Sequence, residues 1–243
     1  LACRQGARAP LDADFSIRHK KALNIADKNN MENNQINKFP RLALLGLVLL
    51  TLTAAETMAQ SEQRVAYFAG GCFWCTETDF ENIDGVSEVI SGFMGGEKAN
   101  PSYSDVAGGR TQHRETVKVV FDPQKVSYQN LLSAFWRMHD PSDATGSFVD
   151  RGRQYSSAIY YVDDAQRRLA EGGVQALDAS GKFDTPIATA IEPAGAFYPA
   201  EAYHQDYYLK SSLKYKYYRY RSGRDQFIEK TWAGDDTVYQ IAQ

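Results

Sequence analysis

The sequence predicts an α+β fold, a two-layer sandwich in which helices pack on a mainly antiparallel, mixed sheet. Segments typical of strands and helices follow one another in the order β-α-β-β-α-β-α-β between residues 65 and 210. Some connections between them suit hairpins and others suit crossovers, which favours a mixed sheet. The order also fits a ferredoxin-like domain, although the first strand-to-helix turn would suit a doubly wound sheet as well.

The N-terminal half of the predicted domain holds three strands and one helix. Residues 65–69 are an apolar run, and the helix expected over 72–82 carries three aromatic side chains. A turn at Asp84 and Gly85 precedes a second strand over 86–91. Residues 116–122 alternate between apolar and polar side chains, as a half-buried strand does. The connection over 93–112 is rich in glycine, and a loop of that length is usually functional.

The C-terminal half adds three helices and two strands. Ser127 is expected to cap a helix with Leu131, Leu132, Phe135 and Trp136 on one face. After a polar loop over 140–154, the remaining elements are expected as a strand over 155–162, a helix from its cap Asp163 to Gly181, a strand over 187–191 and a helix over 200–210.

The first 59 residues are expected to lie outside this domain. Residues 1–30 show no apolar periodicity and are interpreted as an upstream extension. Residues 31–59 combine basic residues, the apolar run Leu42–Leu50 and small residues, which is the pattern of a secretory signal peptide. The apolar run is shorter than the ~20 residues of a spanning helix, although an uncleaved anchor is the alternative. We therefore expect one exported domain over 60–243 in the bacterial periplasm, with no stable membrane insertion.

Charge and cysteine content narrow the possible functions. Residues 61–243 carry 19 Lys and Arg against 25 Asp and Glu, without a basic stripe, which argues against nucleic acid as a partner. The tail, residues 211–243, is basic and rich in tyrosine over its first part, and an amphipathic surface strand or ordered tail is expected there rather than a binding patch. Cys3 lies in the extension, so the domain keeps only Cys72 and Cys75, which is no disulfide framework.

The sequence Gly-Gly-Cys-Phe-Trp-Cys at 70–75 is the strongest chemical signal in the chain. It places Cys72 at a strand-to-helix turn, where a helix N-terminus favours the thiolate. Cys75 follows one helical turn later, within reach of a disulfide if the backbone bends slightly. A nucleophilic cysteine with a resolving partner is typical of a thiol redox enzyme.

Other interpretations of this cysteine pair stay open. A structural disulfide in a non-enzymatic binding module is one. A thioredoxin-like disulfide oxidoreductase is another, although the aromatic residues between the cysteines argue against it. We expect no metal site, because His113, His139 and His204 are widely separated in the sequence. Phe73 and Trp74 would usually be helix-face core, but beside a nucleophile they could form an apolar pocket for an S-methyl group.

Several sequence blocks, in the same order, resemble the A-type peptide methionine sulfoxide reductases. The resemblance extends from about Val65 to Lys210. The blocks that carry it are Gly-Cys-Phe-Trp at 71–74, the loop Gly92–Tyr103, His113-Arg114-Glu115, Phe135-Trp136 with His139-Asp140-Pro141, Gln154–Tyr160 and Tyr203-His204-Gln205.

The resemblance implies an α+β sandwich and a role for each matching residue. Cys72 would be the nucleophile, Phe73 and Trp74 the wall against the substrate methyl group, and Glu115 the proton donor to the sulfoxide oxygen. Tyr103 and Tyr155 would hydrogen-bond that oxygen, with Asp150 and Tyr207 completing the polar side. The substrate would be methionine S-sulfoxide, free or in proteins.

The resemblance also implies how the enzyme is recycled. No cofactor would be bound, and thioredoxin or a similar dithiol would supply electrons. Many members of the family carry recycling cysteines in a glycine-rich tail, but no cysteine follows Lys210 in this chain. The resolving role therefore falls to Cys75. Nothing in the sequence requires more than a monomer.

Overall fold

The computed structural model describes residues 62–235. The extension predicted over 1–30, the signal peptide predicted over 31–59 and the end of the tail lie outside the described residues. Within residues 62–235, no helix has both the length and the apolar character needed to cross a bilayer.

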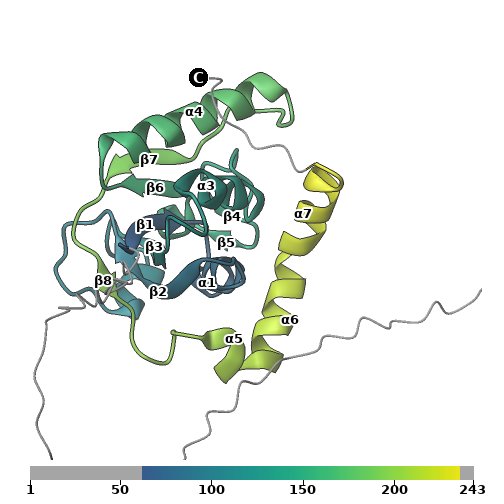
Figure 1. Ribbon diagram of the computed structural model, residues 1–243. Helices are drawn as coiled ribbons and strands as arrows, with labels where there is room; N and C mark the ends of the chain where they lie inside the picture. Colours follow the sequence, from purple (N-terminus) through teal and green to yellow (C-terminus); the bar gives the residue numbers. More distant parts are fainter. Residues whose placement is uncertain (1–61, 236–243) are drawn as a thin grey trace, which may run out of the picture. The chain divides into compact units, whose positions relative to one another are not determined.

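A mixed sheet of six strands forms the centre of this part of the chain (Figure 1), in the order β7-β6-β1-β3-β2-β8. Only the β6–β7 pair is parallel, and the other neighbours are antiparallel. The strands are β1 Arg64–Ala69, β2 Val86–Met94, β3 Arg114–Phe121, β6 Ala158–Tyr161, β7 Ala190–Pro193 and β8 Tyr198–Pro199, while β4 Gly146–Ser147 and β5 Asp150–Arg151 form a separate hairpin.

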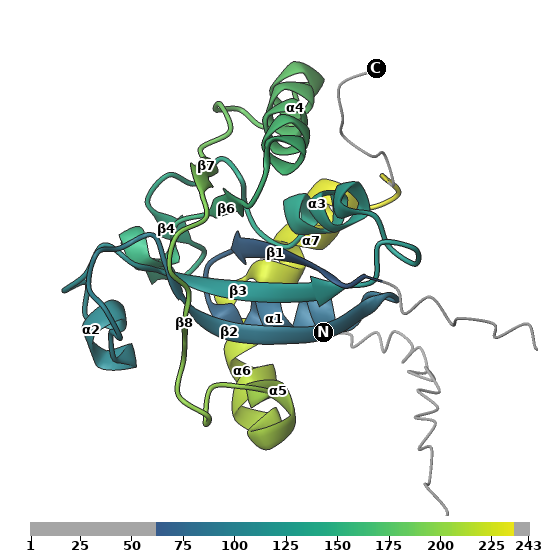
Figure 2. The same cartoon turned by 60° about the vertical axis from the view of Figure 1, so that its left-hand side comes forward.

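Helices cover one face of the sheet, and the segment that carries β8 crosses the other face (Figure 2). On that second face Phe197 packs on Tyr67, with ring centres 5.5 Å apart. The predicted α+β fold of a mixed sheet with helices is confirmed. The helices are α1 Phe73–Glu81, α2 Tyr103–Ala107, α3 Tyr128–Arg137, α4 Asp164–Ser180, α5 Tyr207–Lys210, α6 Ser212–Ser222 and α7 Arg224–Trp232, with the 3-10 turn η1 Arg153–Tyr155.

The main core lies between the sheet and α1, α3 and α4. Phe68 of β1 stacks on Phe80 of α1 at 4.8 Å and contacts Phe135 of α3 at 4.9 Å, and all three side chains are fully buried. Burying a side chain of this size contributes roughly 1.5–3 kcal/mol relative to leaving it exposed. These contacts fix α1, and with it the cysteine motif, on the sheet.

Local signals in the sequence predicted several boundaries correctly. Ser127 and Asp163 cap α3 and α4 through their side chains, which accept the amides of Asn130 and Gln166. Gly181 ends α4 in the left-handed conformation, as a glycine C-cap commonly does.

Other boundaries differ from the prediction. The strand predicted over 86–91 continues to Met94, and the glycine-rich connection contains α2, which begins with a capping box between Ser102 and Asp105. The strand predicted over 155–162 is shorter, because Tyr155 belongs to a 3-10 turn. The strand predicted over 187–191 begins only at Ala190, where it pairs with β6.

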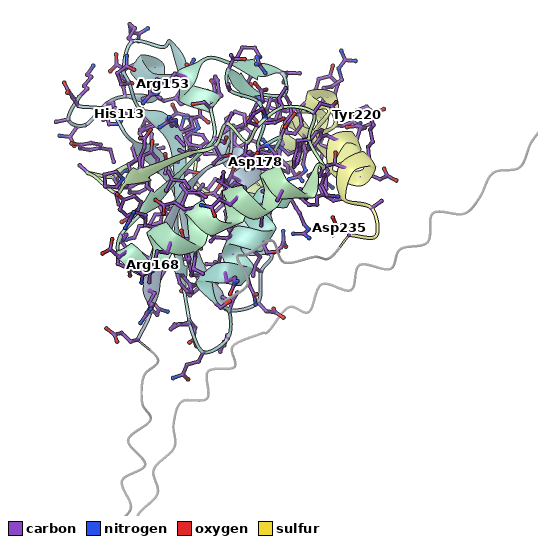
Figure 3. All side chains as sticks on the ribbon, turned by 90° about the horizontal axis from the view of Figure 1, so that it is seen from above. His113, Arg153, Arg168, Asp178, Tyr220 and Asp235 are labelled. Carbon is purple, nitrogen blue, oxygen red and sulfur yellow. The ribbon has the colours of Figure 1, made fainter. Side chains whose placement is uncertain are left out.

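The C-terminal region differs most. A single helix was expected over 200–210, but only Tyr207–Lys210 is helical, because Asp206 has a left-handed backbone with φ of 51°. Gln205 also accepts the Ser91 amide and donates to the Ser91 carbonyl, which holds the preceding segment against β2. Of the two alternatives expected for the tail, a surface strand or an ordered tail, the strand is wrong and the tail is ordered, since residues 212–232 form α6 and α7. Figure 3 labels Tyr220 on α6, on the opposite side of that view from His113 and Arg153.

Candidate active site

The Cys72 side chain lies at the start of α1, as predicted. Cys72 is the N-cap residue, its carbonyl accepts the amides of Cys75 and Thr76, and it is 6% exposed. Gly71 reaches this turn with φ of +91°, and a Cβ atom there would lie 2.4 Å from the Cβ of Ser147. Glycine is therefore required both for the backbone conformation and for the close approach of β4 at Ser147.

The two cysteines are not joined by a disulfide, and both thiols are buried and hydrogen-bonded to each other. Burial raises the pKa of Cys72 well above its ordinary value, the hydrogen bond and charge of Cys75 and the charge of Glu115 raise it further, and a hydrogen bond with the Tyr218 hydroxyl opposes them. The thiolate expected at Cys72 from the helix N-terminus alone is thus disfavoured by burial.

Cys75 has the opposite tendency. The pKa of Cys75 is lowered overall. The hydrogen bond from Cys72 and the positive charges of Arg224 and Arg219 lower it, whereas burial raises it. Because the two thiols interact strongly, the first proton lost belongs to the pair. The arginines stabilise the resulting charge on the Cys75 side.

Glu115 of β3 is a buried carboxyl beside the cysteine turn. Its Oε2 accepts the Phe73 amide at 3.0 Å, and the residue is 2% exposed. Burial raises the pKa of Glu115 to about 8, the Phe73 amide opposes this shift, and the charges of Asp150 and Cys75 add to it. A carboxyl with this pKa is largely protonated at neutral pH and can donate a proton.

An aromatic wall stands next to Cys72. The indole of Trp74 stacks on Tyr207 at 3.8 Å with an angle of 9° between the rings, and its Nε1 donates to Nδ1 of His204 at 3.0 Å. Phe73 contacts Tyr103 and His204, with ring centres 6.2 and 5.0 Å apart. The sequence placed Tyr207 on the polar side of the site, whereas its ring here extends the apolar wall.

The remaining predicted residues face the same centre. Burial raises the pKa of Tyr103 and of Tyr155, and in both cases the negative charge of Glu115 is the next cause, with Cys72 also contributing. Asp150 of β5 accepts a hydrogen bond from the Tyr218 hydroxyl. The structure therefore brings together Cys72, Cys75, Glu115, Phe73, Trp74, Tyr103, Asp150, Tyr155 and Tyr207 from segments that are far apart in sequence.

Sequence reasoning missed the residues that α6 and α7 bring to this site. Tyr215, Tyr218, Arg219 and Ser222 recur at i, i+3, i+4 and i+7, which is the spacing of one helix face. All four are buried or half-buried, in contrast to Tyr217 and Tyr220, which are each 68% exposed. That periodicity was the signal that could have identified a helix packed on the domain. Across residues 62–235, no three His, Cys, Asp or Glu side chains are grouped so that they could hold a metal ion.

Comparison with known sequences identifies the family. The model of the family described as peptide methionine sulfoxide reductase matches residues 64–236. The peptide methionine sulfoxide reductase MsrA of Listeria innocua is 45% identical over 177 residues, covering 73% of this chain and 100% of that protein. Its counterpart from Bacillus licheniformis is 47% identical over 171 residues, covering 70% and 94%. The MsrA/MsrB protein of Vibrio cholerae is 44% identical over 206 residues, or 82% of this chain, which spans only 54% of that relative.

Solved structures agree with the sequence comparison. Reduced Mxr1 from Saccharomyces cerevisiae is similar with a TM-score of 0.56 at 30% identity, over 63% of this chain and 88% of that chain. Methionine sulfoxide reductase A of Corynebacterium diphtheriae gives a TM-score of 0.56 at 34% identity, over 64% and 78%. The chain therefore belongs to the peptide methionine sulfoxide reductase family, in its MsrA branch, and is an enzyme that reduces methionine sulfoxide.

Proposed function

We propose that the enzyme reduces the S epimer of methionine sulfoxide, free or within oxidised proteins, with Cys72 as nucleophile and Glu115 as proton donor. One observation carries the proposal: the Phe73 amide, directly after the nucleophile, holds a buried Glu115 carboxyl at 3.0 Å. This contact keeps the acid next to the cysteine turn in a setting that favours its protonated form.

In the first step the Cys72 sulfur attacks the sulfoxide sulfur while the oxygen is protonated. Glu115 delivers its proton to that oxygen, and the proton of the buried Cys72 thiol replaces it. Tyr103 and Tyr155 donate hydrogen bonds to the oxygen as negative charge develops there. The sulfur–sulfur bond and the substrate sulfur–oxygen bond then break as the hydroxyl passes to the Cys72 sulfur, which releases methionine and leaves Cys72 as a sulfenic acid.

The aromatic wall selects the substrate. Phe73 and Trp74, with Tyr207 stacked on the indole, form an apolar wall against which an S-methyl group can pack. The oxygen-binding residues lie around Glu115, so methyl group and oxygen would occupy different sides of the sulfur. A chiral sulfoxide fits such a site in only one of its two configurations.

Cys75 would then resolve the sulfenic acid as a Cys72–Cys75 disulfide, which a thioredoxin-like dithiol reduces. The leader pattern supports export, so we place the enzyme in the periplasm, supplied with electrons by a membrane relay or an exported dithiol protein, and acting as a monomer. We also assign the domain to the ferredoxin-like arrangement, supported by the β-α-β-β-α-β order and the strand order β6-β1-β3-β2.

The test is turnover of each separated epimer of a blocked methionine sulfoxide with dithiothreitol as reductant. Consumption of the S epimer alone is expected. If neither epimer is consumed while both thiols are free, and scrambled disulfides are isomerised instead, the cysteine pair belongs to a disulfide oxidoreductase and the proposal fails.

A further inference from the structure

The first residue of α7, Arg224, is a buried cation directly behind the cysteine motif. It is 1% exposed. Its Nη2 donates to the Gly70 carbonyl at 3.2 Å, its Nη1 donates to the Met138 carbonyl, and its guanidinium carbon lies 4.9 Å from the centre of the Phe148 ring. The buried Nε atom has no hydrogen-bond partner. The guanidinium is therefore fixed against the backbone that leads into Cys72, with one donor unused.

This cation has no carboxylate of its own. Among residues 62–235, none forms a salt bridge with Arg224. Among the carboxylates, Asp79 has the strongest charge interaction with Arg224. That carboxylate already forms a salt bridge with Arg219, with 2.6 Å between the two atoms. A buried charge without a counter-ion costs several kcal/mol. The site therefore favours an additional negative charge beside Arg224.

The Cys75 thiol can supply that charge. Cys75 and Asp79 are four residues apart on α1 and so lie on one face of the helix. In Figure 1, α6 and α7 run beside α1. Burial lowers the pKa of Arg224, but the interaction with Cys75 is the largest of those that raise it overall.

We propose that Arg224 is a positioning residue that stabilises the resolving thiol of Cys75 as a thiolate, so that the α6–α7 segment activates the second step of the reaction. The proposal rests on the resolving role of Cys75 put forward above. The α6–α7 segment would thus contribute a counter-ion to recycling.

The step is balanced without a further reactant. The Cys75 thiolate attacks the sulfur of the Cys72 sulfenic acid, a sulfur–sulfur bond forms, and the sulfur–oxygen bond breaks. The oxygen leaves as water after taking a proton, for which Glu115 is the nearby acid. The Cys75 sulfur is oxidised and the Cys72 sulfur is reduced, and no electrons enter or leave the pair.

Several other groups act on the charge of Cys75. Cys72 lowers the pKa of Cys75 through its hydrogen bond, Arg219 lowers it, and Asp79 raises it. The acidic groups of Glu115, Tyr215 and Tyr218 also interact with Cys75. Arg219 is partly neutralised by Asp79 and Asp225, whereas Arg224 has neither partner. Arg224 is therefore the cation whose removal should affect Cys75 most.

The test compares Arg224→Met with Arg221→Met in the full chain. Arg221 is an exposed arginine near the end of α6, so its variant removes the same charge from the same segment. The reduced protein is mixed with one equivalent of N-acetylmethionine S-sulfoxide without reductant. Methionine is quantified, sulfenic acid is trapped with dimedone, and the Cys72–Cys75 disulfide is followed by mass spectrometry over a range of pH.

We expect Arg224→Met to form methionine within about threefold of the wild-type rate but to close the disulfide at least ~10-fold more slowly near neutral pH, with a dimedone adduct at Cys72. Loss of one pKa unit of stabilisation reduces the thiolate fraction tenfold. The slow step should recover as the pH is raised, and Arg221→Met should behave as wild type. Equal losses in both steps, or an unchanged disulfide step, would overturn the proposal.

A second measurement remains decisive if Arg224→Met does not fold. Arg224→Lys keeps the charge and should close the disulfide faster than Arg224→Gln, provided that the two variants are folded to the same extent. In a Cys72→Ser background, thiolate absorbance should show Cys75 titrating at lower pH when Arg224 is present than when it is replaced by Gln. Equal titration of Cys75 in the two proteins contradicts the proposal. Absence of methionine from the wild-type protein would instead indicate that the proposed function has failed.

Discussion

At the level of single residues, the hydrogen bond between the Phe73 amide and Glu115 holds the proton donor next to the nucleophilic cysteine. The amide belongs to the first turn of α1, and the carboxyl belongs to β3. Burial, not this hydrogen bond, dominates the pKa of Glu115, because the amide alone would favour the ionised form. The carboxyl is therefore held in place by a contact that favours its anion and kept protonated by its surroundings.

Replacing Glu115 by Gln should lower turnover by ~10²-fold or more, as expected for loss of a general acid. The Gln oxygen can still accept the Phe73 amide, so the fold should be retained. Since the protonated form is active and the pKa is about 8, wild-type turnover should fall as the pH rises through about 8. That decline should disappear from the residual activity of the variant, as measured by kcat over pH 6–10. Near-normal turnover of Glu115→Gln at neutral pH would exclude Glu115 as the donor.

Gly71 is a second residue whose identity the site depends on. Gly71→Ala should destabilise the protein by more than the ~1–3 kcal/mol of a left-handed backbone alone, since its Cβ would lie 2.4 Å from Ser147. Gly181→Ala is the matched control, with φ of +64° and no atom within 4 Å of the added carbon. Urea unfolding of both variants separates the two effects. Equal losses would show that the contact with Ser147 relaxes without cost.

At the scale of elements, α6 matters because it brings a hydroxyl to both Asp150 and Cys72. The Tyr218 hydroxyl donates its single proton to the Asp150 carboxylate, and the same proton can turn to the Cys72 thiolate, an interaction that lowers the pKa of that thiol. A short helix that contributes one inward face thereby becomes part of the active site.

Tyr218→Phe should therefore slow alkylation of Cys72 near neutral pH and move its pH dependence to higher pH, because a contact that stabilises the thiolate is removed. A fall in kcat/KM of about tenfold is expected for one pKa unit. Tyr217→Phe provides the control, since this neighbour on α6 is 68% exposed. Identical alkylation profiles for the two variants would contradict a role of the α6 face in the site.

At the scale of the whole molecule, Glu77 links its stability to pH. This carboxyl of α1 is fully buried, and neither of its oxygens has a hydrogen-bond partner. Burial raises the pKa of Glu77 to about 7, and the negative charges of Glu81 and Asp206 add to this shift. The Asp206 amide and the Ser91 hydroxyl oppose it, although neither forms a hydrogen bond with the carboxyl. The unfolded chain would ionise at about 4.3.

The sign of the effect follows from these two values. The contribution of protonated Glu77 to stability is full below about pH 4.3 and is lost as the pH rises to about 7. Glu77→Gln, which stays neutral, should therefore be more stable than wild type at pH 8, by an amount on the order of 3 kcal/mol. Denaturant unfolding at pH 5 and pH 8 measures it, with the exposed Glu88→Gln as control. A wild-type advantage at pH 8 would show that ionised Glu77 has a counter-ion.

Local chemistry explains what the sequence predicted well. The caps Ser127, Asp163 and Gly181 act within a few residues of their own position, and the apolar periodicity of α3 reports which face is buried. The motif Gly-Cys-Phe-Trp-Cys is equally local, so the strand-to-helix turn at Cys72 could be predicted from it. The matching blocks of sequence then identified the family and indicated which residues form the site.

By itself, therefore, the sequence determined the α+β class, the cysteine turn and the enzyme family, because each depends on short-range patterns or on residue identity. Only the tertiary structure decided the state of the thiols, since burial and the two arginines of α6 and α7 act across more than 140 positions of the chain. It also decided that Tyr207 stacks on Trp74 and that residues 212–232 are helices packed on the domain. Desolvation and long-range charge depend on which segments meet in space, and neither leaves a signal at a single position of the sequence.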